Sequence, residues 1–170
     1  MNIAIRRATP ADRPAIVEIN DSAFGGPAES ALVGALERSG RPVISLVALA
    51  DDVPAGHIFF SPVRIHSPGP PIPAAALAPM AVSPRFQRYG IGSQLVDAGL
   101  RECANAAYQV VVVVGHPHFY RRFGFTSAAS LGLASVYSDA GDAFIALELT
   151  AGVLAGRTAV VEYPAEFAGV

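Results

Sequence analysis

The residues from Gln87 to Ser93 place an arginine and two closely spaced glycines just before a segment of helical periodicity. Glycines allow unusual φ angles and let a ligand approach the backbone closely. The first amides of a helix have no carbonyl partner within the helix, and they lie at the positive end of its dipole. Such a turn suits a pyrophosphate. We therefore predict an anion-binding turn at residues 88–93.

Other phosphate motifs fit this segment less well. A dinucleotide-binding fingerprint requires a glycine or alanine where the chain has Leu95, and a P-loop requires a lysine, which the chain lacks. Taken alone, the Gly90 and Gly92 pair also fits a turn used only for packing.

Two segments together resemble one protein family. Gln87-Arg88-Tyr89-Gly90-Ile91-Gly92 resembles the Q/R-x-x-G-x-G/A signature of the GCN5-related N-acetyltransferases (GNAT), and residues 115–125 are similar to the family's tyrosine-containing helix ending in Gly-Phe. The resemblance covers roughly residues 3–149 and is strongest over 74–125. It implies a mixed, mostly antiparallel α/β (α+β) sheet of about six to seven strands, flanked by about four helices, with a splayed cofactor cleft between the central strands.

The resemblance implies acetyl-CoA as co-substrate. The pantetheine arm would pair, as an added pseudo-strand, with the backbone of Met80, Ala81 and Val82. Pro79 fits this arrangement because a residue without an N–H belongs where ladder pairing has stopped. The pyrophosphate end would be bound by the turn, which consists of Gln87, Arg88, Tyr89, Gly90, Ile91, Gly92 and Ser93.

Acetyl transfer to an amine passes through a tetrahedral oxyanion and expels a thiolate. Tyr120 matches the position at which the family often has a tyrosine general acid. A phenol with a pKa near 10 can donate a hydrogen bond or a proton to a thiolate whose conjugate acid has a pKa near 8.5. The alternative is that Tyr120 is only a packed helix aromatic.

The general base has two candidates. Some relatives have an acidic residue at the start of the strand before the tyrosine helix, but this chain has Tyr108-Gln109 there. Glu29, at the start of an expected helix, and His116, at the mouth of the expected cleft, could each serve; a water chain would also suffice. Glu29 could instead be a solvated helix residue, and His116 a loop residue that caps or packs. His116 and His118 resemble a metal pair, but no third ligand is nearby, so no metal site is expected.

These residues predict an N-acetyltransferase that acts by direct attack of a primary amine. The acceptor is a small molecule or a peptide, and residues 23–38 and 61–73 are expected to shape its pocket. The alternative is a non-catalytic acyl-CoA-binding or sensing module, which would lack a usable base. The oligomeric state is left open, a homodimer included.

Periodicity and turn residues predict the elements that position this chemistry. An N-cap at Thr9 and a closing glycine at Gly40 are among these signals, and five consecutive valines indicate a central strand buried on both faces. The expected strands are residues 2–6, 43–50, 55–65, 74–82, 110–114, 143–149 and 158–163, and the expected helices are residues 10–24, 28–39, 90–106 and 117–123.

Composition limits the class of protein. The 170 residues predict a single domain over 1–170, and the chain is 52% hydrophobic with a net charge of -2, which excludes disorder and disfavours nucleic acid. No apolar run is long enough to cross a membrane, and no secretory signal is visible, so a cytoplasmic protein is expected. All 12 basic residues are arginines, which indicates a GC-rich bacterial genome. Cys103 is expected to be a buried helix residue.

Overall fold

The computed structural model describes all residues from Met1 to Val170, and the chain divides into two compact units. The first unit comprises residues 1–61, 78–102 and 165–170, and the second comprises residues 62–77 and 103–164. The strands are β1 (Ile3–Arg7), β2 (Ile44–Ala50), β3 (Val53–His66), β4 (Ala74–Val82), β5 (Val110–Val114), β6 (Thr126–Ser127), β7 (Leu133–Ala134), β8 (Phe144–Glu148) and β9 (Ala159–Glu162). The α-helices are α1 (Arg13–Phe24), α2 (Ala28–Arg38), α3 (Ile91–Asn105) and α4 (Pro117–Tyr120).

The first unit is built on an antiparallel sheet. Strand β1 pairs with β2, and β2 pairs with β3. The turn between β2 and β3 is made by Asp51 and Asp52, whose φ angles of 45° and 66° are left-handed, as a two-residue hairpin turn requires. At the end of β4, the amide of Ser83 donates to the carbonyl of Ala55 at 2.8 Å, which ties this segment to β3.

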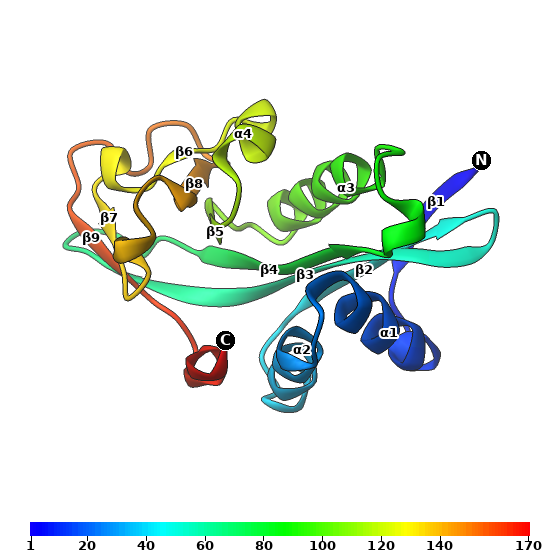
Figure 1. Ribbon diagram of the computed structural model, residues 1–170. Helices are drawn as coiled ribbons and strands as arrows, with labels where there is room; N and C mark the ends of the chain where they lie inside the picture. Colours follow the sequence, from blue (N-terminus) through cyan, green and yellow to red (C-terminus); the bar gives the residue numbers. More distant parts are fainter. The chain divides into compact units, whose positions relative to one another are not determined.

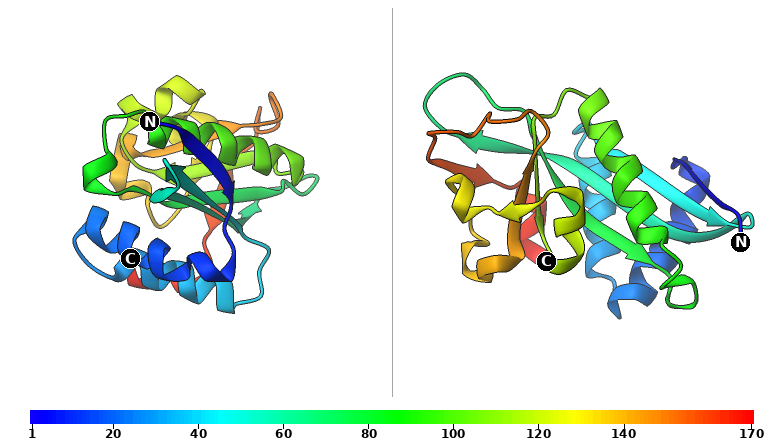
Figure 2. Two further views of the ribbon diagram at one scale, coloured as in Figure 1. Left: turned by 90° about the vertical axis from the view of Figure 1, so that its right-hand side faces the viewer. Right: turned by 90° about the horizontal axis from the view of Figure 1, so that it is seen from above.

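Helices cover both faces of this sheet (Figures 1 and 2). Helices α1 and α2 lie on one face, and α3 lies on the other. Each helix buries apolar residues at helical spacing, and full burial of one such side chain contributes about 2 kcal/mol. The buried apolar residues on these helices include Ile16, Ile19, Leu32, Val33, Leu36, Ile91, Leu95, Val96 and Cys103.

The second unit contains the parallel pairing. Residues Ala74–Ala76 of β4 pair with Val110–Val112 of β5, and this ladder ends there. Strand β5 also pairs antiparallel with β8, and β8 pairs with β6. The end of β3 pairs with β9, which pairs in parallel with β7. Four of the five valines of β5 are buried, but Val114 is 44% exposed.

The expected fold class is confirmed: the sheet has nine strands and is mostly antiparallel. Every helix and strand expected from the sequence is present with small shifts at the ends. The first helix begins as a 3-10 turn at Pro10–Asp12, and the last expected helix ends as a 3-10 turn at Arg121–Phe123. The two-residue strands β6 and β7 were not predicted. None of the helices is long and apolar enough to span a membrane.

A cluster of polar side chains is buried inside the first unit. His57 of β3 is fully buried, with Nδ1 3.1 Å from Asn20 Nδ2 and Nε2 3.0 Å from Ser45 Oγ. Asn20 Nδ2 also donates to the carbonyl of Ile16 at 2.9 Å. Burial lowers the pKa of His57 to about 4, so the ring is neutral at neutral pH.

This histidine should make the free energy of unfolding depend on pH. The unfolded chain binds the proton below about pH 6.5, but the folded chain binds it only near pH 4, so acid stabilises the unfolded state in this window. We expect the free energy of unfolding, measured with urea, to be about 2 kcal/mol lower at about pH 5 than at about pH 7. His57→Gln should remove this difference, while the exposed control His118→Gln should keep it. An unchanged difference in His57→Gln would contradict the assignment.

Candidate active site

The predicted anion-binding turn connects β4 to α3 within the first unit. It opens with a 3-10 turn at Pro84–Phe86. Gln87 then donates from Nε2 to the carbonyl of Val82 at 3.0 Å, which fixes the turn to the end of β4. Arg88 has a φ of 70° and Gly90 a φ of 79°, so the backbone is left-handed twice within three residues.

The left-handed conformation is unfavourable for Arg88. A residue with a side chain costs about 1–2 kcal/mol in this region, and such strain is concentrated at ligand-binding sites. Gly90 adopts the same region without that cost. A side chain added at Gly90 would have open space around its Cβ, so the φ angle alone accounts for glycine there.

The first turn of α3 provides amide donors. The first hydrogen bond of the helix runs from the amide of Gln94 to the carbonyl of Gly90 at 3.2 Å. By helix geometry, the amides of Ile91 and Gly92 have no carbonyl acceptor within the helix. The side chains of Arg88 and Tyr89 are exposed, Tyr89 by 61%. Backbone donors, a helix dipole and a guanidinium therefore gather at one turn, and this set can bind a pyrophosphate.

The residues expected to pair with pantetheine lie at the end of β4. Ala81 is buried, whereas Met80 and Val82 are half-buried. All three come after the end of the parallel ladder at Ala76. Their backbone pairing with a ligand stays a prediction.

Tyr120 lies in the second unit, at the end of α4. Its ring is 6% exposed and packs edge-to-face against Phe119 at 4.9 Å and Phe125 at 5.5 Å between ring centroids. Burial raises the pKa of the phenol to about 12, so it is protonated at neutral pH. The hydroxyl has no hydrogen-bond partner in the protein, and its oxygen keeps some exposed surface. It is therefore available as a donor to a ligand.

Comparison with known proteins gives the family. Residues 4–128, most of the chain, match the family model for the acetyltransferase (GNAT) domain. The chain belongs to the GNAT acetyltransferase family. The curated Escherichia coli K12 protein named uncharacterized N-acetyltransferase YhbS is 34% identical to this GNAT chain over 164 residues, which cover 96% of the chain and 97% of YhbS.

Two solved GNAT structures are similar to this one. YhbS from Escherichia coli in complex with CoA has a TM-score of 0.89 at 33% identity, covering 98% of this chain and 92% of that one. A GNAT acetyltransferase from Brucella melitensis in complex with acetyl-CoA has a TM-score of 0.79 at 30% identity, covering 98% of both chains.

The two base candidates of this GNAT chain lie in different units. Glu29 is half-buried in the first turn of α2, in the first unit. His116 is exposed in the second unit, and its carbonyl accepts the amides of Phe119 and Tyr120 at the start of α4. The role of each residue as the general base stays a prediction. His116 and His118 have no third metal-ligating side chain grouped with them.

Sequence reasoning did not single out Gly115, which lies against Tyr120. A Cβ built at Gly115 would be 2.7 Å from Cε2 of the tyrosine ring. The Gly115 amide donates to the carbonyl of Ala143 at 2.9 Å, so the backbone is held at this point. The sequence shows only a glycine after a strand, which is typical of any turn.

Proposed function

We propose that this GNAT chain transfers the acetyl group of acetyl-CoA to a primary amine by direct attack. The observation that carries the proposal is the turn before α3, where a strained Arg88 and the first helical amides form a site suited to a pyrophosphate. The complexes of similar GNAT proteins with CoA and acetyl-CoA support the choice of cofactor.

The proposed roles follow from the groups available. Amides and the guanidinium of residues 87–93 bind the pyrophosphate, and backbone groups of Met80, Ala81 and Val82 pair with pantetheine. The amine attacks the thioester carbonyl, and the carbon–sulfur bond breaks as the tetrahedral intermediate collapses. Glu29, His116 or water accepts the proton lost by the amine. No covalent enzyme intermediate is needed.

Tyr120 is proposed to act on the departing sulfur. With its pKa raised to about 12, the phenol is a weaker acid than a thiol whose pKa is about 8.5. Complete proton transfer to the thiolate is therefore unfavourable, whereas a hydrogen bond to it is favourable and grows as charge develops on sulfur. The tyrosine serves mainly as a hydrogen-bond donor to the leaving thiolate.

Gly115 should be a positioning residue for Tyr120. In Gly115→Ala the new methyl group displaces the tyrosine ring, because the ring lies within 2.7 Å of its position. We expect turnover to fall about tenfold to a hundredfold with little change in CoA affinity, since small displacements of a catalytic group have effects of this size. Gly169→Ala is the control, because nothing lies within 4 Å of its Cβ position and the residue is outside the segments proposed to bind acceptor or cofactor. Equal turnover in both variants would exclude the positioning role.

The acceptor is proposed to be a small-molecule or peptide amine in the bacterial cytoplasm, acetylated by a monomer or homodimer. A panel of amines, peptides included, tests this by release of free CoA, with CoA binding measured in parallel by calorimetry. Acceptor-dependent CoA release supports the transferase. Tight CoA binding without release for any acceptor would favour the acyl-CoA-binding module instead.

A further inference from the structure

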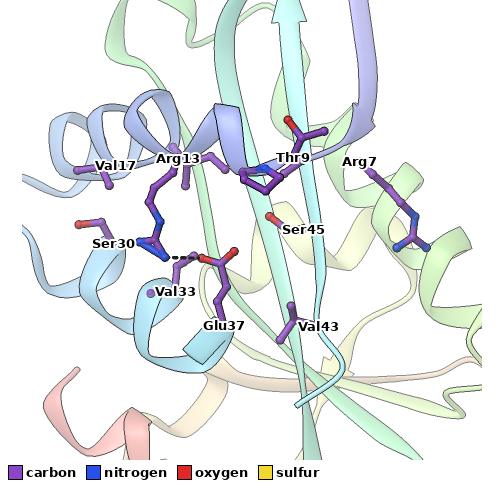
Figure 3. Close-up of a pocket in the computed structure, with 13 residues that line it drawn as sticks. Arg7, Thr9, Arg13, Val17, Ser30, Val33, Glu37, Val43 and Ser45 are labelled. Atoms are coloured by element: carbon purple, nitrogen blue, oxygen red, sulfur yellow. Dashed lines mark hydrogen bonds and ion pairs between the residues drawn. The ribbon is translucent and has the colours of Figure 1, made fainter. Parts of the chain in front are cut away.

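A pocket of about 340 Å³ lies in the first unit, between α1, α2 and the start of β2 (Figure 3). Its volume is in the range of small-molecule sites. The helices that form it cover the face of the sheet opposite α3, so it is separate from the anion-binding turn (Figure 1). Apolar side chains line part of it, namely Ile16, Val17, Val33 and Val43.

The buried polar cluster fixes a donor in the wall of this pocket. Asn20 Nδ2 donates to the carbonyl of Ile16, so the amide nitrogen, not the oxygen, faces His57 Nδ1. Nδ1 must then accept, and the proton of the neutral ring is on Nε2, which donates to Ser45 Oγ. Ser45 lines the pocket, and its own hydroxyl hydrogen is left for a ligand. This tautomer cannot take a proton from Ser45, so the cluster does not create a nucleophile.

An arginine and a glutamate lie at another part of the pocket. Arg13 reaches from α1 toward Glu37 on α2, at 3.5 Å, in an exposed pair that contributes little to stability (Figure 3). A Cβ at Gly34 would be 3.0 Å from Arg38 Nη1 and 3.5 Å from Arg13 Nη1, so two guanidinium groups converge there. Arg38 makes no salt bridge and does not line the pocket, so Arg13 is the guanidinium there whose carboxylate partner a ligand could replace.

The other charged residue of the pocket is already neutralised. Arg7 pairs with Glu102 at 2.7 Å and points away from the cavity (Figure 3). The hydroxyl of Ser30 also has a partner, because it donates to Asp21 at 2.6 Å. The groups left for a ligand are therefore the guanidinium of Arg13, the hydroxyl of Ser45 and the apolar wall.

We propose that this pocket binds a small aliphatic carboxylate that has a second hydrogen-bond acceptor, such as an oxo or hydroxy acid. The carboxylate displaces Glu37 as the partner of Arg13, the aliphatic stem lies against the valines, and the second acceptor receives the hydrogen of Ser45. The inference does not depend on acetyl transfer, because binding is measured without acetyl-CoA.

The test uses three matched probes: levulinate, valerate, which lacks the oxo group, and levulinamide, which lacks the charge. Titration followed by calorimetry or NMR should show levulinate binding with a Kd of about 1 mM, the size expected for so small a ligand. Valerate and levulinamide should each bind several-fold more weakly than levulinate, because each loses about one hydrogen bond to the pocket. No binding of levulinate, or equal binding of all three probes, would overturn the proposal.

Substitutions of two exposed residues should change the affinity for levulinate in opposite directions. Arg13→Gln should weaken levulinate binding about tenfold, since it removes a charged hydrogen bond. Glu37→Gln should strengthen binding about twofold to fivefold, because it removes the competitor for Arg13. Arg101→Gln and Asp97→Asn, exposed on α3, are the matched charge controls and should leave affinity unchanged. Weaker binding in Glu37→Gln, or no effect of Arg13→Gln, would overturn the assignment.

Discussion

Tyr120→Phe is expected to lower turnover about a hundredfold or more, the range typical of lost acid or donor catalysis, with CoA affinity nearly unchanged. The substitution removes one hydroxyl and keeps the ring that packs against Phe119 and Phe125. That hydroxyl has no partner in the protein, so its loss leaves no buried group unpaired. Steady-state rates with an identified acceptor and calorimetry with CoA measure the two effects separately.

Phe119→Leu is the matched control for Tyr120→Phe. It alters the packing around the tyrosine ring but keeps the hydroxyl. We expect a smaller loss of turnover in this variant. If Tyr120→Phe retains turnover within about twofold of the parent, Tyr120 is only a packed aromatic and another donor serves the thiolate.

Gly92→Val is expected to weaken CoA binding about tenfold or more. The valine side chain would stand in the first turn of α3, where the pyrophosphate meets the helix amides, and each charged hydrogen bond lost there costs a factor of about ten or more. Valine is no worse than glycine in a helix, so the fold should be retained. Calorimetry with CoA and thermal unfolding measure affinity and stability side by side.

Gln94→Val provides the comparison for this variant. Gln94 is exposed on the same helix but lies outside the proposed pyrophosphate contacts, so a valine there should leave CoA affinity unchanged. Unchanged affinity in a folded Gly92→Val protein would remove the pyrophosphate assignment from this turn.

The elements of the fold could be predicted because their signals are local. Five valines in succession mark β5, and Asp51-Asp52 marks the hairpin turn between β2 and β3. The anion-binding turn could also be predicted, since its glycines and the following helix are adjacent in the chain. Strands β6 and β7 have two residues each, too few to produce a periodic pattern.

The contacts around the candidate groups could not be predicted, because they join residues far apart in the chain. The hydrogen-bond partners of His57 come from α1 and β2, and these hydrogen bonds depend on how the elements pack. The left-handed φ of Arg88 was not foreseen either, because arginine rarely adopts it. The requirement for glycine at Gly115 comes from its contact with the tyrosine ring five residues later, which the sequence does not show.

The most direct test of acetyl transfer follows the acetyl group itself. The protein is incubated with acetyl-CoA that has a deuterated acetyl group and with the amine panel, and both the amines and the intact protein are then weighed by mass spectrometry. Direct attack predicts a labelled acetyl group on an amine, one free CoA for each acetylated product, and no label on the protein. Label retained on the protein would contradict direct attack, and the absence of any labelled amine would contradict the transferase itself.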